Sequence, residues 1–263
     1  MLHYTKIERH PGGEWVVFLH GIGGGSGIWM RQVREFRKHF NLLLIDLPGH
    51  GNSEYGLHDM EEKSFNAVSK EILKVLDHEN VNSAHFVGIS LGTILVQSIH
   101  DLEPERVKSM VLGGAVEKFT WFAKLIIGVA ETVKRFVPYM WLYKICSVIL
   151  MPRKNHKESR LAFVNEAYKL GKREFLYWMK LHKEVEKTIE RAKASTNKTP
   201  KLYIMGSEDH MFLSSVEEKL NSSKNEKLSI IKECGHVCNI ERYKEFNKRT
   251  LSFLLPLVPS STN

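Results

Sequence analysis

The chain has 263 residues, of which 43% are hydrophobic and 26% charged, and its formal net charge is +8 at pH 7. This composition is ordinary for a globular chain with a large core, and it excludes a fibrous or intrinsically disordered protein. Three cysteines are too few for a disulfide framework and fit a reducing compartment. Residues 1–6 lack the apolar segment of a signal peptide, so we expect a cytoplasmic protein.

The first predicted element is a buried strand over residues 14–19, where apolar side chains follow one another. It ends in residues 20–25, His-Gly-Ile-Gly-Gly-Gly. Because glycines let the backbone approach a ligand closely, this loop can supply half of an oxyanion hole. We expect Gly21 and Gly23 to lie against the substrate.

A second apolar strand is predicted over residues 41–45. It is followed by residues 46–53, Asp-Leu-Pro-Gly-His-Gly-Asn-Ser, a segment dense in turn-forming residues. His20 and His50 belong to the two loops described so far. We interpret both as hydrogen-bonding parts of the loop architecture rather than as reacting groups.

A third strand over residues 84–87 leads into residues 88–92, Gly-Ile-Ser-Leu-Gly, and then into a helical segment. This pattern is typical of a nucleophile elbow. The turn from strand to helix is so sharp that its serine adopts strained backbone angles, and side chains in place of the flanking glycines would collide with neighbouring elements. We therefore expect the Ser90 hydroxyl at a helix N-terminus, where an anion is favoured.

The motifs His-Gly-x-Gly, Asp-x-Pro-Gly-His-Gly-x-Ser and Gly-x-Ser-x-Gly occur in that order. With them the chain resembles the α/β-hydrolase superfamily, specifically its small lidded serine hydrolases of the esterase and lipase type. The resemblance implies an α/β fold with a mostly parallel central sheet flanked by helices, and a helical lid inserted after the sixth strand. It also implies a nucleophile, then an acid after a later strand, then a histidine near the C-terminus.

Two later strands end in residues that fit the implied order. The strand predicted over residues 201–206 is followed by Asp209, and the one over residues 227–231 is followed by His236. Both side chains would stand in loops just past the strand ends, as Ser90 does. We therefore predict that these three residues form a catalytic triad.

Each predicted role has a physical reason. A serine hydroxyl is a poor nucleophile at neutral pH, so His236 would take its proton during attack. Asp209 would fix the imidazole tautomer and stabilise the imidazolium that forms. The backbone N–H groups of Leu91 and Ile22, with Gly23 as the alternative to Ile22, would form the oxyanion hole.

Other arrangements fit parts of this pattern. Glu117 follows an earlier predicted strand, over residues 107–113, and is a rival acid because some members of the superfamily place the carboxylate there; we favour the later aspartate. Cys234 and Cys238 bracket His236, yet Cys-x-His-x-Cys without a fourth ligand is poor zinc spacing. We predict no metal site, and the proposed chemistry needs no cofactor.

Residues 118–196 differ in composition from the flanking sequence and form the predicted lid. Their first part, residues 119–151, is rich in aromatic and aliphatic side chains, but charges and a proline interrupt it. It is therefore no membrane span of ~20 apolar residues. The second part, residues 157–193, has helical spacing. We expect three to five helices that cover the serine, with Trp121 and Trp141 contacting the substrate.

The remaining residues, 1–117 and 197–263, form the predicted core domain. The lid holds 17 Lys and Arg against 7 Glu and no Asp, a net charge of +10, so the basic character of the chain belongs to the lid. Two explanations stay open: a solvated basic face, or a surface that attracts anionic lipid or acidic substrates. No nucleic-acid-binding motif accompanies the charge, and we predict no nucleic-acid partner.

An apolar, aromatic lid over a serine nucleophile predicts a carboxylic-ester hydrolase. Its substrate would be a small or medium lipophilic acyl ester, monoacylglycerol-like molecules included. Because relatives share these motifs, a carbon–carbon bond hydrolase, a lactonase and a menaquinone-pathway synthase stay open as alternatives. A small-molecule sensor that keeps the triad and signals to a partner protein is the alternative from another class.

Overall fold

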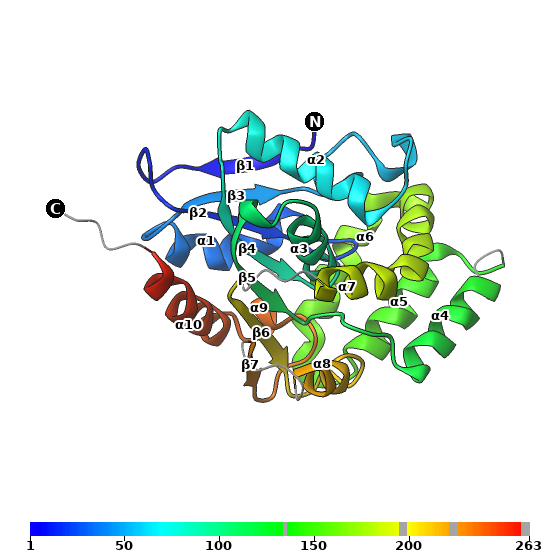
Figure 1. Ribbon diagram of the computed structural model, residues 1–263. Helices are drawn as coiled ribbons and strands as arrows, with labels where there is room; N and C mark the ends of the chain where they lie inside the picture. Colours follow the sequence, from blue (N-terminus) through cyan, green and yellow to red (C-terminus); the bar gives the residue numbers. More distant parts are fainter. Residues whose placement is uncertain (134–135, 195–198, 221–225, 259–263) are drawn as a thin grey trace.

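A seven-stranded sheet lies at the centre of the computed structural model, which describes residues 1–133, 136–194, 199–220 and 226–258 (Figure 1). The strand order is β1-β3-β2-β4-β5-β6-β7. β1 pairs antiparallel with β3, and the other five pairings are parallel, as the predicted fold requires. The strands are β1 (Tyr4–Ile7), β2 (Trp15–Leu19), β3 (Asn41–Ile45), β4 (Ala84–Ile89), β5 (Val107–Gly113), β6 (Lys201–Gly206) and β7 (Glu226–Ile231).

Both faces of the sheet are buried along its inner strands, which explains why their sequences are mostly apolar. Along β2, Val17 and Leu19 pack into one cluster with α2 and α3, whereas Val16 and Phe18 pack into another with α1 and α10. The helices of the core are α1 (Met30–Phe36), α2 (Phe65–His78), α3 (Leu91–Leu102), α8 (Leu213–Leu220), α9 (Cys238–Glu241) and α10 (Tyr243–Leu254). Short 3₁₀ helices accompany them: η1 (Ser26–Trp29), η2 (Leu57–Asp59), η3 (Pro104–Arg106) and η6 (Leu255–Leu257).

The parallel strands bring several chain segments to one edge of the sheet. Leu19 at the end of β2 lies opposite Gly88 in β4, and Ile89 lies opposite Gly113 at the end of β5. Loops that follow parallel strands gather at this carboxyl edge, which is where ligands bind in open α/β sheets.

A helical segment between β5 and β6 forms the cap, which we define as helices α4 to α7. These helices are α4 (Trp121–Val133), α5 (Tyr139–Leu150), η4 (Lys154–His156), α6 (Lys157–Lys180), η5 (Leu181–Glu184) and α7 (Val185–Ala194). The cap follows the fifth strand, so the expected position after the sixth is wrong. The number six came from the family resemblance. In the described part of this chain one strand, β1, precedes the strand β2 that leads into the glycine loop, so the strand before the cap is the fifth.

The division into separate core and lid domains stays a prediction, and its boundary at residues 196 and 197 lies outside the described residues. No described helix combines the length and the apolar character that a bilayer crossing requires.

The cap is tied to the core by its longest helix. α6 bends at Gly171, whose φ of 75° lies in the left-handed region that favours glycine. Beyond the bend, the buried Glu174 carboxylate accepts hydrogen bonds from the Leu57 N–H and from His58 Nδ1. The second half of α6 is therefore fixed to the loop that follows β3.

Candidate active site

Ser90 stands in the sharp turn between β4 and α3. Its φ of 53° and ψ of −119° are strained for a residue with a side chain. A Cβ at Gly92 would lie 2.1 Å from the Leu19 carbonyl oxygen, and one at Gly88 would lie 2.7 Å from the Gly92 carbonyl. The flanking glycines are therefore required by close packing, which is the steric reason inferred from the motif.

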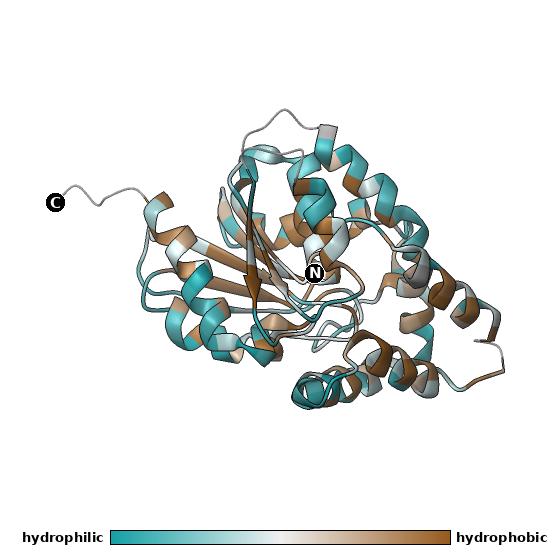
Figure 2. Cartoon of the chain, turned by 90° about the horizontal axis from the view of Figure 1, so that it is seen from below, coloured by the Kyte–Doolittle hydropathy of each residue, from teal (hydrophilic) through white to brown (hydrophobic). Residues whose placement is uncertain are grey.

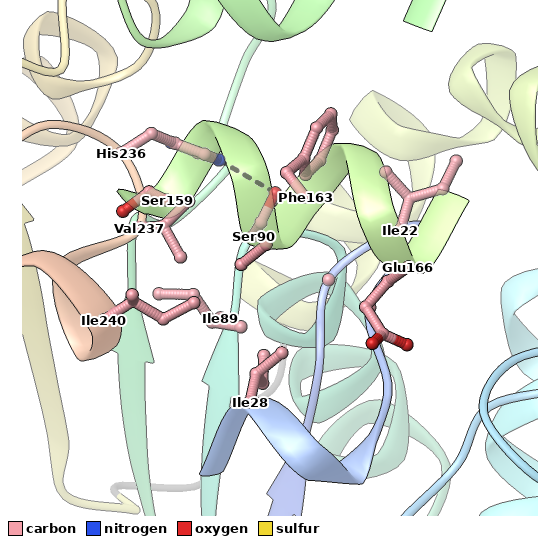
Figure 3. Close-up of a pocket in the computed structure, with 13 residues that line it drawn as sticks. Ile22, Ile28, Ile89, Ser90, Ser159, Phe163, Glu166, His236, Val237 and Ile240 are labelled. Carbon is pink, nitrogen blue, oxygen red and sulfur yellow. Dashed lines mark hydrogen bonds between the residues drawn. The ribbon is translucent and has the colours of Figure 1, made fainter. Parts of the chain in front are cut away.

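A chain of hydrogen bonds connects three side chains at the carboxyl edge of the sheet. His236 Nε2 lies 2.8 Å from Ser90 Oγ, and His236 Nδ1 lies 2.8 Å from Asp209 Oδ2 (Figure 3). Asp209 is fully buried and His236 almost so. Because a carboxylate only accepts, Nδ1 carries the proton and Nε2 accepts from the serine hydroxyl. This is the arrangement that serine activation requires.

The acid is held by the loop after β6. Asp209 Oδ1 accepts a hydrogen bond of 3.2 Å from the backbone N–H of Phe212. The Phe212 ring packs against the imidazole of His236, with ring centroids 5.1 Å apart. One short segment thus orients both the carboxylate and the imidazole.

The rival acid Glu117 has other partners. Its carboxylate accepts a 3.1 Å hydrogen bond from the Tyr203 hydroxyl and lies 3.0 Å from Lys219 Nζ. Asp209 therefore contacts the histidine, whereas Glu117 is part of a buried ion pair.

The glycine loop is held by the peptide between Ile22 and Gly23. Its N–H, from Gly23, donates to His50 Nε2 at 2.9 Å, and its carbonyl, from Ile22, accepts from the Tyr143 hydroxyl at 3.1 Å. The Gly23 N–H is thereby engaged elsewhere. The backbone N–H of Ile22 is therefore the remaining candidate donor for this side of the oxyanion hole.

Two buried histidines fix the loops around this peptide. Burial lowers the pKa of His50 to about 3, so its ring is neutral, donates from Nδ1 to the Pro48 carbonyl at 3.0 Å and accepts at Nε2. Burial also lowers the pKa of His20, which bridges the Gly21 carbonyl and the Leu47 N–H. Both rings thus make the structural hydrogen bonds expected from the sequence.

Two cavities meet at Ser90, and Ile22 and His236 line both. The larger one has a volume of about 190 Å³ and is lined mostly by apolar side chains from core and cap. They include Leu91, Ile94, Val116, Phe119, Ile127, Leu150 and Trp178. The smaller one, of about 40 Å³, is lined on one side by residues of α6 (Figure 3).

Among the α6 residues that line the smaller cavity, sequence reasoning missed Ser159, Phe163 and Glu166. Ser159 is buried, and its hydroxyl has no hydrogen-bond partner in the part of the chain that the structure describes. The spacing of these residues, four and then three positions apart, places them on one helix face. That spacing was a usable signal, although it does not reveal which face turns inward.

The two tryptophans expected to contact substrate are not brought to the cavities. Trp121 is 77% exposed, Trp141 is 65% exposed, and neither lines the larger or the smaller cavity. The reason is the rotation of the cap helices, because α4 presents Ile127 and α5 presents Leu150 to the larger cavity instead. The expectation for Trp121 and Trp141 is therefore corrected.

The cysteines beside His236 are packing groups. Cys234 and Cys238 are both buried, and burial raises the pKa of each thiol. The Cys238 thiol donates to the Ile204 carbonyl at 3.5 Å. Among the described residues, no cluster of three or more His, Cys, Asp or Glu is arranged to hold a metal ion.

Comparison with known proteins agrees with this architecture. Residues 14–139 match the family model described as the alpha/beta hydrolase fold. The chain is similar to (E)-2-((N-methylformamido)methylene)succinate hydrolase of Acinetobacter baylyi, at 30% identity over 47% of this chain and 46% of that protein. It is also similar to pimeloyl-[acyl-carrier protein] methyl ester esterase of Aeromonas salmonicida, at 28% identity over 51% of this chain and 56% of that protein.

Among solved structures, a meta-cleavage product hydrolase from Pseudomonas fluorescens superimposes with a TM-score of 0.76 at 20% identity, covering 98% of this chain and 95% of that one. The family model and these solved structures confirm the α/β-hydrolase fold that the motifs implied. The matches with the two curated relatives span about half of each protein's length.

Proposed function

We propose that this protein is a serine hydrolase that cleaves a carboxylic ester through an acyl-enzyme. The observation that carries the proposal is the hydrogen-bonded chain from Ser90 through His236 to Asp209 beside an apolar cavity. The names of the curated relatives support a hydrolytic reaction, and one of them is an esterase.

The reaction proceeds in two steps on these residues. Ser90 Oγ bonds to the ester carbonyl carbon while its proton passes to His236 Nε2. The bond to the leaving alcohol then breaks, and the alcohol takes that proton from His236. Water next attacks the acyl-enzyme with the same histidine as base, which releases the carboxylic acid and restores Ser90. Throughout, Asp209 stabilises the imidazolium.

The negative charge on the carbonyl oxygen needs donors that are already in place. The backbone N–H groups of Ile22 and Leu91 are the proposed pair, one from the loop after β2 and one from the first residue of α3. Loss of one such donor costs about 3 kcal/mol in comparable enzymes. The orientation of the glycine loop is therefore as important to the rate as the side chains.

The two cavities suggest how the ester lies. The larger cavity, about 190 Å³, is apolar and smaller than the roughly 300–1,000 Å³ of pockets for drug-sized ligands, so we assign it a short acyl group. The smaller cavity is also lined mainly by apolar side chains, and the Ser159 hydroxyl in its lining has no hydrogen-bond partner among the described residues, which suits a small leaving alcohol. The proposed substrate is thus a small lipophilic ester.

The test is turnover of p-nitrophenyl esters from acetate to palmitate by the wild type and by Ser90→Ala. We expect turnover to be highest for short acyl groups, to fall for palmitate, and to vanish in the variant. Equal rates for wild type and variant would refute the proposal. No turnover of any ester by the wild type would favour the other bond types or the sensor.

A further inference from the structure

Large apolar side chains are exposed on the first two cap helices. Trp121, Leu125 and Val129 are exposed on α4, Trp141, Ile145 and Val148 on α5, and Phe136, 85% exposed, lies between the helices. These seven side chains fall within residues 121–148 and make up more than half of the exposed large apolar residues that the structure describes. Such clustering marks an interaction surface, whereas scattered apolar side chains need no explanation.

The exposed residues follow helical spacing, so each helix has one apolar outer stripe. On α4 they recur every four positions, and on α5 they are Trp141, Ile145 and Val148. The opposite face of α5 is buried through Leu142 and Tyr143. Figure 1 places both helices at the end of the molecule away from the C-terminus, and Figure 2 colours much of this end as hydrophobic.

The same segment of the sequence carries a net positive charge. Residues 118–153 contain six Lys and Arg and a single Glu. Lys144 is exposed on α5 next to Ile145, and Lys124 is exposed on α4 next to Leu125. Lys124 also lies 2.8 Å from Glu186 of α7. Apolar stripes bordered by cations match the chemistry of an anionic bilayer surface, where acyl chains lie beneath phosphate groups.

We propose that α4 and α5 form a docking surface for an anionic phospholipid bilayer. Trp141 and Phe136 would enter the interfacial region, where aromatic rings are favoured, while Lys144 would lie among the headgroup phosphates. The helices lie on the surface, consistent with the finding that no described helix is suited to span a membrane. This surface is separate from the ester chemistry and does not depend on it.

Charge favours a bilayer over a second copy of this chain. A symmetric dimer through α4 and α5 would bring two basic segments together, and like charges placed against each other in an interface are costly. An anionic surface instead neutralises them.

Vesicle co-sedimentation tests the proposal with the whole protein. The wild type is mixed with vesicles of phosphatidylcholine alone or with added phosphatidylglycerol, in about 0.1 M salt, where charges interact over about 10 Å. The apolar variant is Phe136→Ser with Ile145→Ser, and its matched control is Met30→Ser, which removes an exposed apolar side chain from α1. The charge variant is Lys144→Glu, and its control is Lys244→Glu on α10.

We expect the wild type to sediment with anionic vesicles roughly tenfold more strongly than with neutral ones, and both cap variants to lose most of that binding. The controls should bind as the wild type does. A cooperative thermal unfolding transition for each variant would show that the variant is folded. Because no turnover is measured, the outcome does not depend on the proposed esterase activity.

Three results would overturn the proposal: no binding to anionic vesicles, equal binding by the folded cap variants, or equal binding to neutral vesicles. A concentration-dependent dimer that the apolar variant abolishes, without vesicle binding, would assign the surface to a second copy instead.

Discussion

At the scale of single residues, the peptide between Ile22 and Gly23 links the cap to the proposed oxyanion hole. Tyr143 belongs to α5, yet its hydroxyl holds the carbonyl of this peptide, while His50 holds the N–H. Burial raises the pKa of Tyr143 well above its usual value, so the hydroxyl stays protonated and donates. The direction of the neighbouring Ile22 N–H is thereby set from two sides.

Tyr143→Phe tests this link. Loss of one net hydrogen bond of about 1 kcal/mol should lower kcat about fivefold while KM changes little, because the oxyanion contact strengthens in the transition state. The matched control is Tyr203→Phe, which removes a buried hydroxyl from the Glu117 pair instead. Equal kcat values for wild type and Tyr143→Phe would show that the bond does not orient the loop.

His50 gives the fold a pH dependence. Its pKa is about 3 in the folded chain and near 6.5 in the unfolded chain, so below pH 6.5 the unfolded chain takes up a proton that the folded chain does not. The free energy of unfolding should therefore fall by about 1.4 kcal/mol per pH unit between pH 6.5 and about 3 from this group.

His50→Gln removes the titration while it keeps a donor and an acceptor. Urea unfolding at several pH values should show that stability falls less steeply with pH in the variant, because the titration of His50 is gone. Some loss should remain, because other buried histidines, such as His85 with a pKa of about 4, titrate in both proteins. Parallel curves for the two proteins would contradict the assignment.

The identity of the acid can be tested by two amide substitutions. Asp209→Asn should lower kcat by about 10⁴-fold, as loss of the correct histidine tautomer does in comparable triads. Glu117→Gln should leave kcat nearly unchanged, because its partners are Tyr203 and Lys219. The reverse order in measured kcat would move the acid to Glu117.

The motifs predicted which side chains lie together, whereas they could not predict how a helix is rotated about its axis. The sequence order of Ser90, Asp209 and His236 was enough to anticipate that they meet, because all three follow parallel strands. In contrast, Trp121 was expected to face inward, since amphipathic spacing identifies a stripe but not its direction. Ser159 carried no motif and was missed.

At the scale of elements, the packing of α3 on β2 depends on Gly92. Gly92→Ala would place a Cβ 2.1 Å from the Leu19 carbonyl oxygen, so backbone must move. We expect a loss of about 3 kcal/mol or more in the free energy of unfolding, measured in urea. Gly27→Ala is the control, because no heavy atom lies within 4 Å of its Cβ, and it should change stability by less than about 1 kcal/mol. Similar losses in both variants would contradict this packing argument.

The elements themselves were predicted well in the buried sheet. The bounds of β3, β5 and β6 agree with the strands predicted from the sequence, because strands buried on both faces are mostly apolar. β1 was missed, since Tyr4–Ile7 is a short edge strand whose side chains are partly exposed and lack that signal.

At the scale of the whole molecule, the cap contributes to the candidate site as well as covering it. Tyr143 and Trp178 reach the loops after β2 and β3, and Glu174 fixes the second of these loops. Composition predicted a helical insertion in this part of the chain, but the contacts that join the cap to the core arise from side chains distant in sequence, and no local pattern predicts such contacts. The sequence likewise did not show that the apolar stripes of α4 and α5 face outward.

The central claim is that Ser90 is an activated nucleophile, and labelling with a fluorophosphonate tests it most directly. The probe phosphonylates an activated serine whatever the natural substrate is. We expect a single adduct on the peptide that contains Ser90, identified by mass spectrometry, and no adduct in Ser90→Ala. An unlabelled wild type, or labelling that persists in the folded variant, would contradict the account.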